Sequence, residues 1–346
     1  MNVKRDENRV WIEGVEGFSS GEWASSIHGS YATILQAVNE RLSYDDLVCL
    51  GGFAFRLGIH ENMCPSAAHP ACGYKCLDGA IRALPWRIDF HESFPWSEPK
   101  PDRTAFETEV RRAVKDSIDR GVPVHYTAEE DGLIVGYGDG GARWWCVHPY
   151  HEDGKEPFWH DEANGFAGPD WPWGIAVWTE PKPQSERANE HELMARALAQ
   201  AVDMWDTERC EDYYVGEAAY RQWIAWLHAV DGDEVDSPES GMQGNGWCFD
   251  VLVQSRRIAS RWLIARATRF DGDAADKLRE AAAHYAKIVE ICTDGLPSTW
   301  DLAPPPSRSS EWTAEMREEQ VRRLELSCEQ DRAATDAIRG LAGRIT

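Results

Sequence analysis

The sequence has few cysteines and no long hydrophobic run. Nine cysteines in 346 residues are too sparse for a disulfide scaffold, and an odd number leaves at least one thiol unpaired. No segment approaches the roughly 20 consecutive apolar residues of a transmembrane helix, and the N-terminal MNVKRDENRVWIEG lacks the apolar core of a signal peptide. We therefore expect a cytoplasmic protein that does not span a membrane.

Clustered positive charge is also missing. The formal net charge is −23 and the pI is about 4.9, so the chain repels phosphate backbones and nucleic acid is not an expected partner. A small molecule or a peptide is the expected ligand, with a cationic one slightly favoured. No cofactor is implied, and the oligomeric state is left open.

Apolar side chains are plentiful enough for two cores. Hydrophobic residues make up 42% of the chain and include 17 tryptophans, and a chain of this length commonly forms two domains. The polar, Pro-containing segment PKPQSERANE at 181–190 has the composition of a linker. The expected domains are therefore residues 1–182 and 190–346.

The first domain mixes helical and strand patterns. Apolar residues recur at helical spacing over 30–42, 44–50, 77–84 and 105–120, with Ser30 as a candidate cap of the first helix. A strand should follow the turn at Gly51, and four short β-branched or aromatic runs predict strands at 123–128, 132–138, 142–150 and 173–180. This order indicates an α+β domain.

The second domain reads as helical throughout. Helices are expected over 191–204, 215–230, 247–270, 273–292 and 313–341, which predicts an all-α bundle. The last of them is long and charged, which would also suit a structural or protein-interaction module.

The order of several short motifs resembles a known family. In chain order they are SSIHGSYATIL, LSYDDLVCLGGFAFRL, CPSAA, RGVPV, DGLIVGYG and PWGIAV. Over about residues 8–182 this order resembles the butirosin-biosynthesis-protein-H N-terminal domain, a relative of bacteriocin-processing cysteine peptidases with a papain-like fold. The helical half resembles the domain often fused behind it.

The resemblance implies a cysteine nucleophile at the N-terminus of the first long helix, where the helix dipole lowers the thiol pKa. Here EWASSIHGSYATIL has no cysteine, and Ser26 takes that position, with Ser25, His28 and Ser30 as near alternatives. The histidine position of the family falls at Glu130 and Asp131. The third position falls at His148.

These replacements leave two functions open. The first is a binding or accessory protein with a degenerate catalytic site, holding its ligand in a cleft between the domains. The alternative is an active acyltransferase or amidohydrolase/peptidase-like enzyme of natural-product metabolism. In the active case His148 would be the base and Glu130 or Asp131 would orient it, or Cys64 would be a relocated nucleophile facing His148 or His60.

Two further groups are candidate ligand sites. Five soft-metal ligands fall within 17 positions, and zinc prefers such ligands in a tetrahedral array: His60, Cys64, His69, Cys72 and Cys76. They include no CxxC pair, so loop cysteines are expected and zinc is the alternative. The aromatic residues Trp144, Trp171 and Trp173 are candidates to line the ligand cleft, with packing at a domain seam as the alternative.

Overall fold

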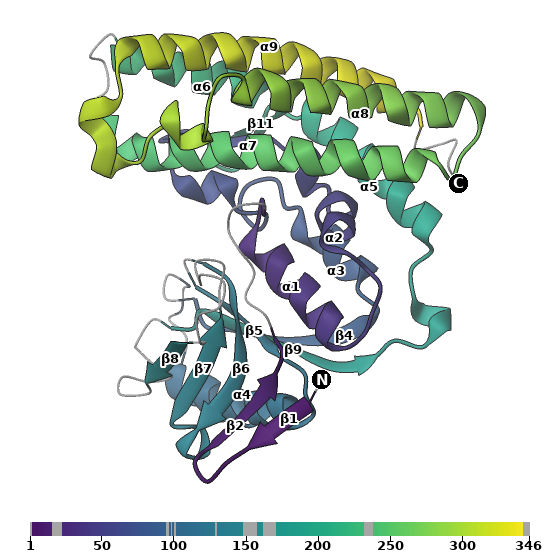
Figure 1. Cartoon of the computed structure of the whole chain (residues 1–346), viewed down its shortest axis with the longest axis vertical. Coiled ribbons are helices and arrows are strands. Elements are labelled where there is room, and N and C mark those ends of the chain that lie inside the picture. The colour runs from purple at the N-terminus through teal and green to yellow at the C-terminus, as the bar shows by residue number, and fades with distance from the viewer. Residues whose placement is uncertain are drawn as a thin grey trace. The chain divides into compact units, whose positions relative to one another are not determined.

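The computed structural model describes residues 2–15, 23–94, 97, 99, 102–128, 130–147, 158–161, 171–231 and 238–341, without side chains at 158–161 and 238–240. Contacts between residues divide the chain into two compact units. Unit 1 comprises Met1–Tyr44 and Leu84–Arg187, and unit 2 comprises Asp45–Ala83 and Ala188–Thr346. Figure 1 colours both by position along the chain. The protein is thus a mixed α+β protein with a largely helical second unit.

The units correct the expected domain boundaries. The chain leaves unit 1 at residues 187–188, close to the predicted linker, but residues 45–83 belong to unit 2 and not to the N-terminal domain. One cause is Arg256, whose guanidinium donates to the backbone oxygens of Ala54 (2.9 Å) and Arg56 (3.1 Å). Hydrogen bonds across 200 residues leave no trace in local periodicity, so the sequence did not reveal them.

Unit 1 is built on an antiparallel sheet (Figure 1). Its strands are β1 (Asn2–Arg5), β2 (Arg9–Glu13), β4 (Trp86–Glu92), β5 (Val124–Thr127), β6 (Gly132–Gly138), β7 (Arg143–Val147), β8 (Phe158–Asp161) and β9 (Gly174–Pro181). The order is β1-β2-β6-β5-β9-β4, and β7 pairs with both β6 and β8. The four strands expected at 123–180 are present, whereas β1, β4 and β8 were not predicted.

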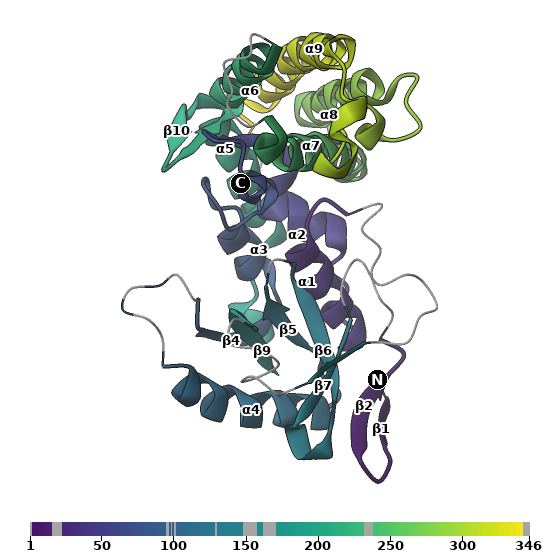
Figure 2. The same ribbon diagram turned by 90° about the vertical axis from the view of Figure 1, so that its left-hand side faces the viewer.

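Helices α1 (Ser26–Ala37) and α4 (Arg103–Asp119) cover opposite faces of this sheet (Figure 2). Side chains alternate along a strand, so Val124 and Tyr126 join the core beside α4, while His125 meets Tyr31 of α1 edge-on, with ring centroids 5.1 Å apart. The alternation of β5 therefore directs one polar side chain, His125, toward the first helix.

Helix α1 begins four residues before the Ser30 start expected from the sequence. Its N-cap is Ser25, and Ser30 is fully buried inside the helix. The hydroxyl of Tyr44 accepts the backbone N–H groups of Ala24 (2.7 Å) and Ser25 (3.2 Å), which holds the chain where the helix starts. Ser26 therefore lies in the first turn.

Unit 2 contains the helices α2 (Tyr44–Leu50), α3 (Leu77–Ala83), α5 (Glu190–Asp206), α6 (Gly216–Asp231), α7 (Pro238–Ala267), α8 (Gly272–Thr293) and α9 (Ala314–Ile338). The five helices predicted after residue 190 are confirmed with shifted ends. The unit is not all-α, because β10 (Arg209–Cys210) and β11 (Tyr213–Val215) form a small sheet with β3 (Gly58–His60). The strand expected after Gly51 is interrupted by a 3-10 turn at Phe53–Phe55 before β3.

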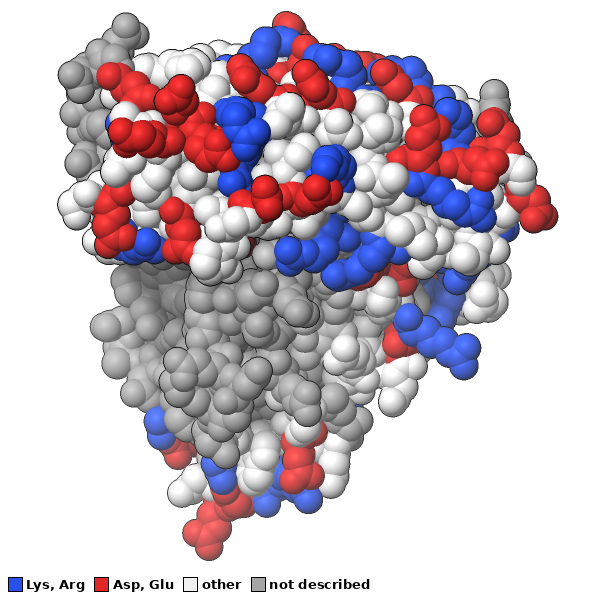
Figure 3. Space-filling view, turned by 45° about the horizontal axis from the view of Figure 1, so that its top comes forward, with Lys and Arg blue, Asp and Glu red and all other residues white. Residues whose placement is uncertain are grey.

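A buried ion pair joins three helices of unit 2. Arg256 of α7 binds Asp331 of α9 through two hydrogen bonds of 2.8 and 2.6 Å, and Tyr220 of α6 donates to the same carboxylate at 2.7 Å. Helix α9, the long and charged helix expected at 313–341, thus contributes a buried side chain to the core of the bundle. On the face shown in Figure 3, both acidic and basic side chains lie over the helices, among uncharged ones. In the described part of the chain, no helix has both the length and the apolar character needed to cross a bilayer.

Candidate functional site

The candidate site begins at the N-terminus of α1. The Ser25 side chain does not cap the helix; its hydroxyl is hydrogen-bonded to Nδ1 of His28 at 3.0 Å. The first intrahelical bond runs from the N–H of Gly29 to the oxygen of Ser25 (3.1 Å). The N–H groups of residues 26–28 precede that bond, and such groups at a helix start favour negative charge.

Ser26 contacts a carboxylate from the sheet. Its hydroxyl donates to Oδ2 of Asp131 at 3.4 Å, and the backbone N–H of Asp131 donates to the Ser26 Oγ at 3.3 Å. Asp131 immediately precedes β6 and is fully buried, while Ser26 is half-buried. Two elements distant in sequence, α1 and β6, thus bring a hydroxyl onto a carboxylate.

His125 completes a chain of three polar side chains. Its Nε2 lies 2.8 Å from Oδ1 of Asp131, and the two side chains are 3% and 0% exposed. Among the described residues, Nδ1 of His125 has no hydrogen-bond partner. Burial, with a smaller contribution from the charge of Asp131, raises the pKa of the neighbouring Tyr31, so that phenol stays neutral.

The chain places the carboxylate between the hydroxyl and the imidazole. In a Ser-His-Asp triad the imidazole stands in the middle and takes the serine proton. Here Asp131 is the group in contact with Ser26, and His125 Nε2 can only support the carboxylate. The arrangement can still pass a proton from Ser26 to Asp131, because the Ser26 hydroxyl donates to this carboxylate and a carboxylate in contact with the proton it takes can act as a general base.

The sequence predicted part of this group. Ser26 and Asp131 were both candidates and the structure brings them together, with Asp131 at the position where the resemblance implies histidine. Glu130 is half-buried beside it, but both hydrogen bonds of Ser26 go to Asp131. His148 lies outside the described residues.

His125 was not a candidate. The available signal was its place in VHYT, where a polar residue interrupts a run that is otherwise buried in a strand. The antiparallel pairing of β5 with β6 sets His125 opposite Leu133, two residues beyond Asp131. A histidine on β5 and an acid just before β6 are close for that reason.

The five candidate zinc ligands do not form a metal site. All five are described, and no three or more His, Cys, Asp or Glu side chains in the described part of the chain could hold a metal ion. Cys76 is buried with its sulfur 3.7 Å from Sδ of Met204, and the His60 ring packs on Tyr213 with centroids 5.0 Å apart. The five possible ligands are close together in the sequence, but their side chains do not meet at one point. The loop turns them toward different partners.

Cys64 was also a candidate for a relocated nucleophile facing His148 or His60, and of these two histidines only His60 is among the described residues. Cys64 belongs to unit 2, and its sulfur accepts a hydrogen bond from Ser66 at 3.0 Å. The Nδ1 of His60 instead accepts the backbone N–H of Asn62 at 3.1 Å. The pairing of Cys64 with His60 is therefore not observed among the described residues.

The tryptophan candidates have different environments. Trp144 is fully buried in the unit 1 core, which corrects its assignment to a ligand cleft. Trp171 is half-buried and meets Tyr126 edge-on at 5.0 Å, and Trp173 is also half-buried. Two of the three residues therefore retain partly accessible rings.

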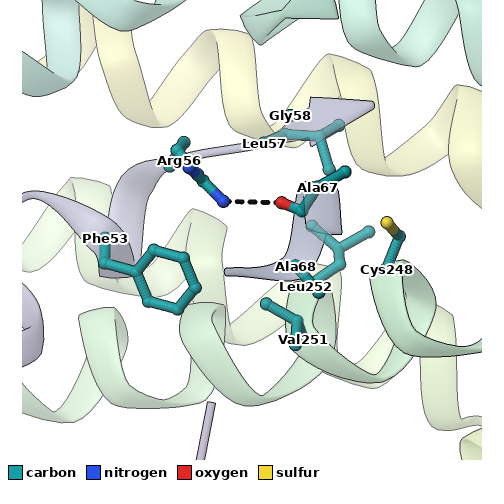
Figure 4. Close-up of a pocket in the computed structure, with 9 residues that line it drawn as sticks. All are labelled: Phe53, Arg56, Leu57, Gly58, Ala67, Ala68, Cys248, Val251 and Leu252. Carbon is teal, nitrogen blue, oxygen red and sulfur yellow. Dashed lines mark hydrogen bonds between the residues drawn. The ribbon is translucent and has the colours of Figure 1, made fainter. Parts of the chain in front are cut away.

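A small pocket in unit 2 is lined by Phe53, Arg56, Leu57, Gly58, Ala67, Ala68, Cys248, Val251 and Leu252 (Figure 4). Its empty space, including the part open to solvent, is about 240 Å³, whereas small-molecule sites usually enclose roughly 300–1,000 Å³. The pocket is therefore smaller than a typical substrate site.

No protein-family model matches this chain, and no curated protein matches it significantly.

Proposed function

We propose that unit 1 carries out acyl transfer or hydrolysis through Ser26, acting on a small ester, thioester or amide. The observation that carries this proposal is the Ser26–Asp131–His125 chain of contacts at the start of α1. The resemblance to the butirosin-biosynthesis-protein-H family supports it, because that family places its papain-like nucleophile at the position of Ser26.

Each residue has a distinct part in the proposed reaction. Ser26 Oγ attacks the acyl carbon while its proton moves to Asp131, and the new C–O bond forms an oxyanion. The N–H groups at the start of α1, which point toward this end of the helix, stabilise that charge. The bond to the leaving group then breaks, and the leaving group takes the proton from Asp131.

His125 is a positioning residue in this scheme. Its Nε2 holds the Asp131 oxygen that does not face Ser26. A neutral imidazole donating to Asp131 fixes the carboxylate and stabilises its charge. In the second half of the reaction, water or another acyl acceptor attacks the acyl carbon on Ser26 and gives its proton to Asp131. The bond between the acyl carbon and Ser26 Oγ then breaks, and Oγ takes the proton back from Asp131.

A binding or accessory protein is the second candidate. Two observations favour it: the Asp131–His125 pair is sealed from solvent, and the 3.4 Å Ser26–Asp131 contact is longer than the roughly 2.5–3.0 Å of a strong O–H···O bond. In that case the three side chains stabilise the domain, and the ligand is a small molecule or peptide that is not transformed.

A serine-reactive fluorophosphonate probe distinguishes the two candidates on the full chain. Intact mass should show one adduct on the wild-type protein and none on Ser26→Ala. Asp131→Asn should label about 100-fold more slowly, the usual minimum effect of losing a general base.

Ser30→Ala is the matched control, because Ser30 lies one turn further along α1 and its buried hydroxyl has no hydrogen-bond partner among the described residues. It should label like the wild type. An unlabelled wild-type protein, or an adduct that survives in Ser26→Ala, would leave the binding protein as the function.

A further inference from the structure

Arg56 differs from the other buried arginines of unit 2, because no carboxylate in the described part of the chain forms an ion pair with it. Three other arginines that are less than a tenth exposed each have such a partner: Arg256 pairs with Asp331, Arg266 with Asp46 and Arg323 with Glu319. Arg56 itself is 5% exposed. A buried charge is costly unless an opposite charge compensates it, so an anion beside Arg56 is favoured.

Hydrogen bonds hold the guanidinium of Arg56 in place but do not neutralise it. The ring of Phe53 lies against one side of the guanidinium, with its centroid 4.9 Å from Cζ. The remaining nitrogen, Nε, makes no hydrogen bond to another described residue. The Nη1 and Nη2 atoms donate at 2.6 to 3.1 Å to the backbone oxygens of Ala67, His69, Cys72 and Tyr74. Backbone oxygens are uncharged, so the positive charge keeps no opposite charge beside it.

The space beside Nε adjoins the small pocket of Figure 4. Arg56 and Gly58 both line this pocket, and a Cβ added at Gly58 would lie 3.8 Å from Nε. Glycine at this position therefore leaves that edge of the guanidinium uncovered. The backbone does not require a glycine there, because Gly58 is not among the described residues with positive φ. The described residues that line the pocket include no acid, so the pocket offers a cation and no competing carboxylate.

We propose that this pocket binds a small monovalent anion, of the size of chloride or nitrate, as the counter-ion of Arg56. The anion accepts the N–H of Nε, and its charge offsets the cost of burying the guanidinium. The empty space of about 240 Å³, part of which is open to solvent, is several times the roughly 30 Å³ that a water molecule takes in the liquid. An ion of a few heavy atoms therefore fits, although a typical substrate does not.

Chloride binding to the full chain tests the proposal, through the line width of the chloride NMR signal. The wild type should broaden this signal in a saturable way, and sodium nitrate should reverse the broadening by competing for the same position. The net charge of −23 keeps non-specific binding of chloride weak. Gly58→Ala places a methyl group beside Nε at an ordinary contact distance. It should weaken chloride binding at least about tenfold, the effect of losing a hydrogen bond to a charged group.

Gly174→Ala is the matched control. It also adds a methyl group to a glycine within a strand, on β9 of unit 1, where the nearest atom to the new Cβ would be 3.4 Å away. This variant should bind chloride like the wild type. Equal chloride affinity in Gly58→Ala and the wild type, or a wild type that does not broaden the signal, would overturn the proposal.

A crystal of the wild type soaked in sodium bromide locates the ion without any substitution. The anomalous peak of bromide should lie in the pocket beside Nε of Arg56, and bromide peaks at other positions alone would overturn the proposal. Substitution of Arg56 is a poorer test, because it would also release the four backbone oxygens that the guanidinium binds.

Discussion

Nε2 of His125 lies 2.8 Å from Oδ1 of Asp131, on a pair of side chains that are almost completely excluded from water. The two residues are six positions apart in the sequence, and the pairing of β5 with β6 keeps them adjacent. A buried polar pair of this kind is costly to break, because the remaining partner stays buried without compensation. This pair therefore affects stability whether or not the site is catalytic.

We expect Asp131→Ala to lower the free energy of unfolding by about 3–5 kcal/mol, since it leaves His125 buried without its partner. Asp131→Asn keeps a hydrogen-bonding group and should cost less, about 1–3 kcal/mol. Urea denaturation followed by tryptophan fluorescence measures both. Ser30→Ala is the control and should be neutral or slightly stabilising, because it removes a buried hydroxyl with no partner among the described residues. Equal stability of Asp131→Ala and the wild type would contradict the prediction.

The Arg256–Asp331 pair should contribute as much to the stability of unit 2 as the Asp131–His125 pair contributes to that of unit 1. Asp331→Ala leaves a guanidinium that is 1% exposed without its carboxylate, with an expected loss of about 3–5 kcal/mol. The exposed pair Arg279–Asp276 on α8 provides the comparison, and Asp276→Ala should cost less than about 1 kcal/mol. Thermal or urea unfolding of both variants tests the difference, and similar losses in the two would show that burial does not decide the cost.

The packing of residues 45–83 into unit 2 can be tested at Gly244. A Cβ added there would lie 1.8 Å from the carbonyl oxygen of Met63, so Gly244→Ala forces α7 away from this segment. We expect a loss of several kcal/mol, above the roughly 1–3 kcal/mol of ordinary overpacking. At Gly272 an added Cβ meets nothing within 4 Å and the residue has a φ of +61°, so Gly272→Ala should cost only about 1 kcal/mol of backbone strain. A Gly244→Ala protein as stable as Gly272→Ala would argue against the assignment of residues 45–83.

Glu319 should make stability depend on pH in the acid range. Hydrogen bonds from Arg322 and then Arg323 outweigh burial and lower the pKa of Glu319 from 4.5 to about 2. A carboxyl with a depressed folded-state pKa stabilises the protein above its unfolded value, so this contribution is present above about pH 4.5 and is lost as the pH falls toward 2. Glu319→Gln should therefore be less stable than the wild type at pH 7, and the difference should shrink at lower pH.

Glu280→Gln, which breaks an exposed pair with Lys277, is the control for that titration. It should change stability by less than about 1 kcal/mol at pH 7, with little pH dependence of the difference. Urea midpoints at several pH values compare the two variants. A Glu319→Gln deficit that grows as the pH falls would have the wrong sign for this mechanism.

The local pattern of apolar residues was sufficient to predict most of the helices and the main strands. The spacing of Phe106, Val110, Val114 and Ile118 predicted α4, and the structure adds only an earlier start, because Asp102 accepts the N–H groups of Thr104 and Ala105. The helices after residue 190 were likewise predicted by their apolar periodicity. Helix ends and short strands such as β1, β10 and β11 were not, because their formation depends on partners elsewhere in the chain.

The sequence by itself determined the helices and main strands, and the presence of Ser26 and Asp131 as candidates, because propensity, capping and periodicity act over a few residues. Only the tertiary structure decided that residues 45–83 join the C-terminal helices, and that the imidazole of His125 lies beside Asp131. It also decided that the loop at 60–76 surrounds a buried arginine instead of a metal-binding set. Each of these outcomes depends either on hydrogen bonds between residues far apart in the sequence or on the register in which two strands pair. Such contacts have no signature in composition or spacing.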